Sequence, residues 1–234
     1  FNFITNLVVE DIQSVAAFCH LHKLKIAVSY DSFGRFNKKD LELFKRNIEI
    51  IAPYIRMISL TMTKQSMELI VNGEDTYFDY LYSRFDCDWD HLLPGNDGLK
   101  PMMPAESDLL RFYKVLADKY PKCINMKSFT ENKLDAAMTS MPCTRGNSFT
   151  IFSDNSVPKG CSGSVILRNA NTADLGGPKI IHNFLEKRNC LECEYYSRCT
   201  FSCFIHNEYK DLVRDVDGCV YAKVFDYVKE KEDE

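Results

Sequence analysis

Residues 190–203 read CLECEYYSRCTFSC and contain four cysteines, and Cys219 follows them. Cys143 and Cys161 precede this stretch, so most of the 10 cysteines lie in the C-terminal part of the chain. Thiolates are soft ligands that bind iron–sulfur clusters, zinc and copper(I). Cysteines at such short spacing therefore favour a metal site in this part of the chain.

The spacing of these cysteines bears on which metal group they would hold. Cys190-x2-Cys193 has the form of a metal-binding turn, but the next spacings are x5 and x3. Structural zinc takes four ligands, most often as two such short pairs. Seven thiolates make one complete site of four and a second site one thiolate short, which an iron–sulfur cluster tolerates. The residues favour two clusters and leave zinc as the alternative.

The composition excludes several classes of protein. A chain of 234 residues, 45% of them hydrophobic, can build a core without the disulfides of short secreted scaffolds. A net charge of −4 provides no basic surface for nucleic acid. No apolar run reaches the roughly 18 residues of a membrane helix, and the start FNFITNLVVE has no signal peptide. We expect a cytoplasmic protein without nucleic-acid or membrane partners.

The N-terminal third alternates strand and helix patterns. Strands are expected at 3–4, 25–30 and 55–62, and amphipathic helices at 12–19, which places Cys19 on the core face, and at 41–51, with Asn37 as the cap. A turn is expected at 31–34. Strands that alternate with helices predict an α/β fold with a parallel sheet, in an open or closed barrel.

The rest of the chain is less regular in sequence. Residues 72–104 contain an aromatic-rich stretch and a loop with His91, a candidate substrate contact, and the helical period returns at 109–120. We expect a domain boundary between 121 and 142, which divides the chain into 1–120 and 121–234. Beyond it we expect short strands, turns, cysteine knuckles and one helix near 178–188. The final KEKEDE is expected to be a helix end or a disordered terminus.

The cysteine series resembles the SPASM domain, the auxiliary-cluster module of many radical S-adenosylmethionine enzymes. CTRGNSFTIF at 143–152 resembles the hairpin after that family's first cysteine, and DNSVP at 154–158 resembles the turn before its second. Asn155 stands where the family usually has Gly, and Asn tolerates a positive φ. The resemblance implies part of a (β/α)6 partial TIM barrel followed by a small, cysteine-rich α+β SPASM domain.

This resemblance also implies a set of cluster ligands. Two auxiliary [4Fe–4S] clusters are expected, the outer one held by Cys190, Cys193, Cys199 and Cys219, and the inner one by Cys143, Cys161 and Cys203. Some relatives have an eighth cysteine six residues before the first, where this chain has Ala137. The fourth inner iron is then open to substrate, with Cys123 as an outside candidate for its ligand.

Three predicted strand ends resemble the third to fifth strands of the family's barrel: Thr5-Asn6, Ser29-Tyr30-Asp31 and Thr61-Met62-Thr63. Ligands collect at the carboxyl ends of barrel strands. Ser29 resembles a serine that contacts the ribose of S-adenosylmethionine, and Arg35 resembles an arginine near the same ligand. Thr5 and Asn6 are expected beside it.

The family's Cys-x3-Cys-x2-Cys motif, which binds the radical-generating cluster, is absent from these 234 residues. In the family it follows the first barrel strand. The resemblance, with the lack of an initiator Met, implies the C-terminal part of a longer enzyme that carries this third cluster. The chain is expected to be inactive alone, although processing or trimming would explain the same start.

Family analogy implies a peptide or protein substrate and an electron donor of the flavodoxin or ferredoxin type. Sulfatase-maturing relatives have an aspartate proton acceptor after the second cysteine, where this chain has Ser162, which argues against that subgroup. Two other classes stay open. One is a zinc-stabilised binding module, and the other is a stand-alone iron–sulfur electron-transfer protein.

Overall fold

The computed structural model describes residues 3–31, 36–92, 97–130, 185–196, 198–199 and 212–232. The chain forms two compact units. Unit 1 comprises residues 1–90 and 115–126, and unit 2 comprises residues 91–114 and 127–234. The expected boundary between 121 and 142 stays a prediction, because much of that range lies outside the described residues.

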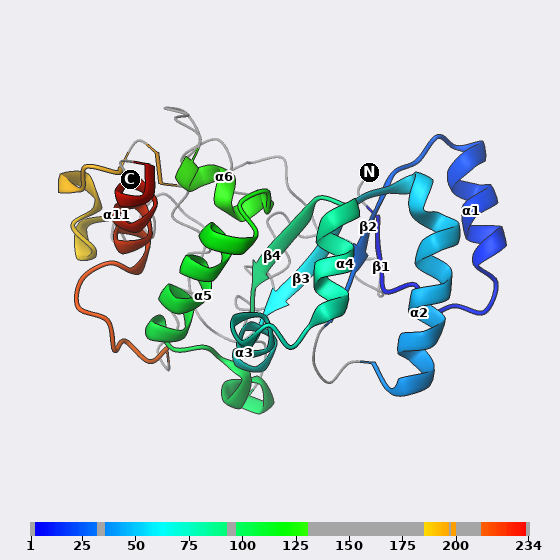
Figure 1. Ribbon diagram of the computed structural model, residues 1–234, viewed down its shortest axis with the longest axis horizontal. Coiled ribbons are helices and arrows are strands. Elements are labelled where there is room, and N and C mark those ends of the chain that lie inside the picture. The colour runs from blue at the N-terminus through cyan, green and yellow to red at the C-terminus, as the bar shows by residue number, and fades with distance from the viewer. Residues whose placement is uncertain are drawn as a thin grey trace. The chain divides into compact units, whose positions relative to one another are not determined.

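Unit 1 is built on a four-stranded sheet in the order β1-β2-β3-β4 (Figure 1). The strands are β1 (Phe3–Thr5), β2 (Ile26–Ser29), β3 (Ile55–Met62) and β4 (Cys87–His91). β1 and β2 run parallel, with Ile4 opposite Ala27, and β2 and β3 run parallel, with Ser29 opposite Ser59. The predicted parallel α/β arrangement is confirmed for these strands.

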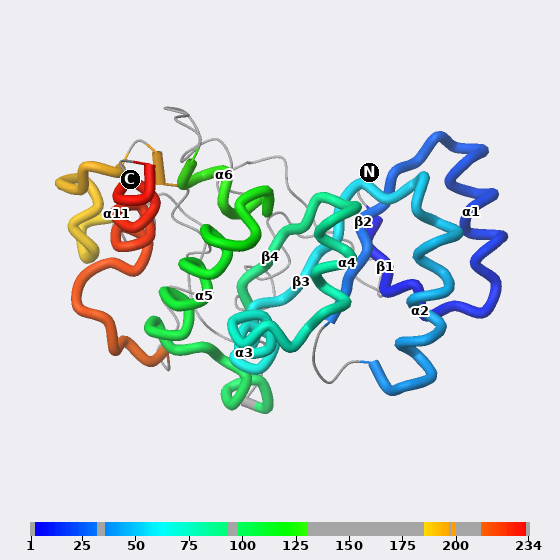
Figure 2. Tube along the Cα trace, in the orientation of Figure 1, coloured from blue at the N-terminus to red at the C-terminus, as the bar shows by residue number. Residues whose placement is uncertain are grey.

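Four α-helices accompany the sheet: α1 (Ile12–Leu21), α2 (Lys38–Ile51), α3 (Lys64–Asn72) and α4 (Thr76–Arg84), with a short 3-10 helix, η1 (Ala52–Tyr54), after α2. Each of these α-helices is capped at its N-terminus by a side chain that accepts a hydrogen bond from a backbone N–H of the first turn. The accepting residues are Asp11, Asn37, Thr63 and Asp75 in turn. Gly73 ends α3 in the left-handed region, with φ 71°. α1 and α2 lie side by side (Figure 2).

One face of the sheet makes the core of unit 1. Ile58 and Leu60 of β3 and Trp89 of β4 are buried, and Phe78 of α4 packs edge-on against Trp89 at 5.4 Å between ring centroids. Cys19 is also buried, as predicted. The aromatic-rich stretch at 77–85 thus forms a helix that contributes to the core.

Helices α3 and α4 and strand β4 were not predicted. The expectation of less regular structure at 72–104 is wrong for α4 and β4, and α3 precedes them. In β4, the buried Cys87 and Trp89 alternate with Asp88 and Asp90. From the sequence alone, the aspartates made this stretch look like an acidic loop, because the residues that pack against Cys87 and Trp89 were unknown. His91 therefore ends a strand rather than lying in a loop.

Unit 2 contains the first part of α5 (Glu106–Lys119) and the last part of α6 (Ile124–Thr130), with η2 (Asp97–Met102), η3 (Cys190–Glu192) and α11 (Val220–Glu232). α5 confirms the helix predicted at 109–120. α6 was not predicted, and α11 contradicts the expectation of one helix beyond the boundary. The KEKEDE stretch forms the end of α11 as far as Glu232, in agreement with one of its two expected forms. The helix is held by one buried face, which includes Val224, Phe225 and Val228.

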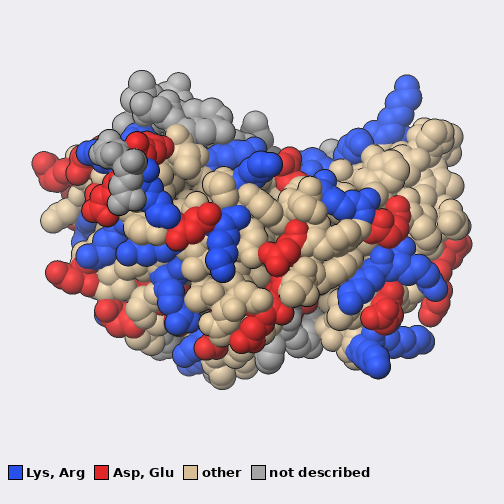
Figure 3. Space-filling view, in the orientation of Figure 1, with Lys and Arg blue, Asp and Glu red and all other residues tan. Residues whose placement is uncertain are grey.

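Several predictions lie outside the described residues: most of the turn at 31–34, the hairpin at 143–152, the turn at 154–158 and most of the helix near 178–188. Within the described residues, no helix has the length and apolarity that crossing a bilayer requires. On the face in Figure 3, basic and acidic side chains are interspersed.

Candidate metal centre

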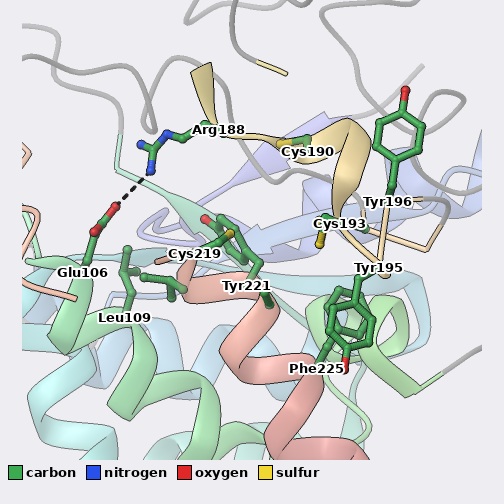
Figure 4. Close-up of a pocket in the computed structure, with 13 residues that line it drawn as sticks. Glu106, Leu109, Arg188, Cys190, Cys193, Tyr195, Tyr196, Cys219, Tyr221 and Phe225 are labelled. Atoms are coloured by element: carbon green, nitrogen blue, oxygen red, sulfur yellow. Dashed lines mark ion pairs between the residues drawn. The ribbon is translucent and has the colours of Figure 1, made fainter. Parts of the chain in front are cut away.

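Four cysteines line one cavity of unit 2 (Figure 4): Cys190, Cys193, Cys199 and Cys219. The first three come from residues 185–199, and Cys219 immediately precedes α11. All four are thiols rather than halves of disulfides. The structure thus brings together the four residues expected to hold the outer cluster. Cys143, Cys161 and Cys203, the expected inner ligands, lie outside the described residues.

A series of tight turns gathers the first three thiols. Asn189 precedes η3 in the left-handed region, with φ 50°, which Asn tolerates better than most residues. The Cys193 backbone N–H then donates to the Cys190 carbonyl at 3.1 Å. Further along, the Cys199 N–H donates to the Tyr195 carbonyl at 2.8 Å. These short loops allow cysteines at x2 and x5 spacing to face the same cavity.

Aromatic and aliphatic side chains form the rest of the wall. Tyr195 stacks on Phe225 with 4.6 Å between ring centroids, and its hydroxyl donates to Asp226 at 2.6 Å. Leu109 and Val220 also line the cavity and are buried. This wall keeps water from part of the thiol environment, which strengthens electrostatic interactions there.

Burial and neighbouring sulfurs alter the chemistry of Cys190. They raise the pKa of its thiol to about 11, with burial as the largest cause and the charges of Cys219 and Cys193 next. The nearby Arg188 guanidinium opposes the shift. Cys190 is therefore protonated at neutral pH in the metal-free protein, and a metal must displace this proton on binding.

One carboxylate stands at the edge of this thiol cavity. Glu106, at the start of α5, is 5% exposed, and its Oε1 lies 3.6 Å from Arg188 Nη1 and 3.3 Å from Arg214 Nη1. Burial raises the pKa of Glu106, and the charge of Arg188 acts against this shift. Neither Glu106 nor the two arginines were among the residues that the sequence singled out.

The arrangement of donors bears on the size of the group that they fit. Tetrahedral zinc with Zn–S bonds of about 2.3 Å requires sulfurs about 3.8 Å apart. Within the described ranges, no group of three or more His, Cys, Asp or Glu side chains is already placed to hold a metal ion. Four cysteine thiols around a cavity are a ligand set that structural zinc and iron–sulfur clusters share, so the lining of this cavity fits both.

The candidate S-adenosylmethionine residues lie where strand ends were predicted. Thr5 and Ser29 are the last residues of β1 and β2, and Asn6 follows β1. Thr5 Oγ1 accepts from the Leu7 N–H at 3.2 Å, and Asn6 Oδ1 accepts from the Val8 N–H at 3.1 Å, so both side chains shape the turn into α1. Their role and that of Ser29 in binding stay predictions, and Arg35 lies outside the described residues.

A polar group that was not predicted lies on the sheet face opposite the core of unit 1. The Ser59 hydroxyl donates to Asp90 at 2.8 Å. Asp88 shares this face, and burial, followed by the charge of Asp90, raises its pKa to about 6. The period-two alternation of CDWDH was the available signal.

Two further candidates lie elsewhere. Cys123 is fully buried in unit 1, where burial raises the pKa of its thiol and the charge of Cys87 adds to the shift. His91 is half-buried, and its Nε2 lies 3.4 Å from the Tyr221 hydroxyl, a member of the cavity wall. His91 is thus near the candidate metal centre, whereas Cys123 packs within unit 1.

The chain resembles a known protein in fold, although not in sequence. No family model matches the chain, and no curated protein matches it in sequence. A solved structure described as a histidine-tagged anSMEcpe with bound AdoMet, or S-adenosylmethionine, is similar, with a TM-score of 0.60 and 18% identity. The match covers 98% of this chain and 73% of that one. An anSME is an anaerobic sulfatase-maturating radical S-adenosylmethionine enzyme. The chain therefore has an α/β fold like that of this enzyme.

Proposed function

We propose that this chain is the part of a radical S-adenosylmethionine enzyme that carries auxiliary clusters, and that the enzyme modifies a peptide or protein. The observation that carries the proposal is the cavity lined by Cys190, Cys193, Cys199 and Cys219, in a chain with the fold of an AdoMet-bound structure. The four thiolates would hold one [4Fe–4S] cluster. When bound, such a cluster supplies one-electron transfer.

The chain's own residues suit this role. The aromatic wall around Tyr195 and Phe225 limits the access of water to the sulfurs. Arg188 carries positive charge beside Cys190, whose thiol becomes anionic on metal binding. Hydrogen bonds, charge and solvent exposure around the sulfurs are the factors by which proteins adjust cluster potentials.

The remaining parts of the proposal rest on the resemblance. Cys143, Cys161 and Cys203 would hold the second auxiliary cluster. Thr5, Asn6, Ser29 and Arg35 would contact S-adenosylmethionine. The radical-generating step belongs to a protein that also carries a Cys-x3-Cys-x2-Cys motif. A flavodoxin- or ferredoxin-type protein would deliver electrons in the cytoplasm.

The substrate is proposed to differ from that of the structural neighbour. At 18% identity the likeness concerns the fold, and a fold hosts many functions. Ser162 stands where the sulfatase-maturing relatives have their aspartate. We therefore propose another peptide or protein as the substrate.

Anaerobic reconstitution with iron and sulfide tests the metal assignment. The wild-type chain is expected to bind about eight irons, for two [4Fe–4S] clusters, and Cys193→Ala about four. Cys19→Ala is the matched control, because Cys19 lies in the core of unit 1 and should leave the iron content unchanged. Zinc without acid-labile sulfide would instead support the zinc-stabilised module, and a wild-type chain that binds no iron would refute the proposal.

A further inference from the structure

The beginning of α5 joins the segment that leads to Cys219. The Glu106 N–H donates to the Val213 carbonyl at 3.0 Å, and the Ser107 N–H donates to Asp215 Oδ1 at 2.9 Å. The first N–H groups of a helix have no partner within it. Residues 213–215 therefore supply the acceptors that cap α5, and in return the helix holds them in place four residues before Cys219.

The Glu106 side chain extends this connection to the other cysteine-bearing segment. Arg214 comes from the segment before Cys219, and Arg188 comes two residues before Cys190. Both guanidinium groups face the same oxygen, Glu106 Oε1, at 3.3 and 3.6 Å (Figure 4 shows the Arg188 pair). One buried carboxylate thus links the two segments that supply the four thiols.

A buried carboxylate is costly unless its charge is compensated, and an apolar side chain could fill the same space at lower cost. Glu106 has this compensation from Arg188 and Arg214, and its side chain is 7% exposed. With Glu106 in place, the three groups together leave one positive charge beside the cavity. The arrangement links the two segments and leaves a single positive charge near the thiols.

We propose that Glu106 is a positioning residue for the four-thiolate site. It holds the segments of Cys190 and Cys219 at one cavity before the metal group binds. This inference rests on the proposed function for the identity of the metal group. The placement of the thiols in the metal-free chain can be tested without that identity.

Glu106→Gln keeps the shape of the side chain and removes its charge, and Glu106→Asp keeps the charge. Glu230→Gln on the exposed side of α11 is the matched control. For each reconstituted protein, iron release to a chelator is timed. For each metal-free, reduced protein, the alkylation of individual cysteines by iodoacetamide is followed by mass spectrometry, and circular dichroism reports folding.

Loss of outer ligands that orient a metal site costs about 10- to 100-fold in affinity. We expect Glu106→Gln to release iron about tenfold faster or more, with partial recovery in Glu106→Asp and no change in Glu230→Gln. In the metal-free protein, the buried Cys190 should be alkylated about tenfold faster in Glu106→Gln, because a buried thiol reacts through local opening, and the partly exposed Cys219 should be alkylated faster by a smaller factor. Wild-type rates of release and alkylation in folded Glu106→Gln would overturn the inference.

Arg188→Met provides the same test if Glu106→Gln does not fold, because Arg188 is the more exposed partner of that pair. Faster alkylation of Cys190 would support the inference, and an unchanged rate would reject it. The two proposals fail separately. A wild-type chain without iron refutes the cluster assignment, whereas the alkylation of the metal-free thiols reports on Glu106 alone.

Discussion

The Asn125 side-chain amide pairs with both backbone polar groups of Trp89. The Trp89 N–H donates to Asn125 Oδ1 at 2.7 Å, and Asn125 Nδ2 donates to the Trp89 carbonyl at 2.6 Å. β4 is the last strand in the order of the described sheet. The amide therefore occupies the place of a further strand at the edge of β4 and fixes the position of the buried Trp89 indole.

Asn125→Ala is expected to lower the free energy of unfolding by about 2 kcal/mol, because it leaves two backbone groups of β4 without this partner. Urea denaturation followed by Trp89 fluorescence measures the change. Asn72→Ala at the exposed end of α3 is the control and should shift the midpoint little. Equal effects of the two substitutions would contradict a special role for the Asn125 amide.

A second buried amide holds the turn after β1. Asn47 of α2 is fully buried, and its Nδ2 donates to the Leu7 carbonyl at 2.9 Å and the Val9 carbonyl at 2.7 Å. Leu7 is in the left-handed region, with φ 55°. Asn47→Asp replaces the donor with a carboxylate that faces two carbonyls, so its folded-state pKa should rise.

The Asn47→Asp protein should be closer to wild-type stability below about pH 4, where the new carboxyl is protonated in both states. As the pH rises, the unfolded state releases this proton first, and the loss should grow to about 3 kcal/mol at neutral pH. Denaturant titrations at several pH values check this slope. Asn47→Ala is the control, and its loss should not depend on pH.

Asp88 is expected to make wild-type stability depend on pH. In the folded protein the pKa of Asp88 is about 6, whereas the ordinary value, which applies to the unfolded chain, is 3.8. Below about pH 4 both states hold the proton. Between these values the unfolded state releases it while the folded state keeps it, so stability falls as the pH rises, and the loss is complete above about pH 6.

Asp88→Asn should therefore be more stable than wild type at pH 7, by at most about 3 kcal/mol, and similar to it near pH 3.5. Urea denaturation of both proteins at each pH gives this difference. The exposed Asp118→Asn change is the control. A constant difference between wild type and Asp88→Asn across the pH range would show that the Asp88 carboxyl is not responsible.

Removal of the metal group should affect the two units differently. Ligand binding stabilises the state that binds. In the described parts of the thiol-bearing segments, 185–196, 198–199 and 212–219, helical structure is limited to residues 185–187 and η3. After chelation, amide hydrogen exchange is expected to accelerate in these segments and to stay unchanged in β2 and β3. Cys193→Ala should show fast exchange at the outset. Uniform acceleration through β3 would contradict the prediction.

Local patterns predicted much of unit 1. The bounds of β3 match the predicted 55–62, and Asn37 caps α2 as expected, because each depends on residues close in sequence. The resemblance to the SPASM domain, and not the spacing alone, indicated that Cys219 lies at the same cavity as Cys190, Cys193 and Cys199. β4 was missed because its alternate aspartates hide the buried Cys87 and Trp89 in an acidic stretch.

The Glu106 contacts could not be read from the sequence for a different reason. Its partner Arg214 lies 108 positions away, and a lone buried glutamate has no distinctive local pattern. The same holds for Asn47, whose partner Leu7 is 40 positions distant. Contacts of this kind depend on tertiary packing, which local propensity does not encode.

The distance along the chain between α5 and residues 213–215 has a consequence for biosynthesis. A nascent chain emerges from its N-terminus, so α5 leaves the ribosome long before Asp215 and Cys219 are translated. Until then the helix lacks its cap and the sulfur set is incomplete. Insertion of the metal group at this cavity must therefore wait until Cys219 has been translated, and the cell needs to keep Cys190 and Cys193 reduced during that interval.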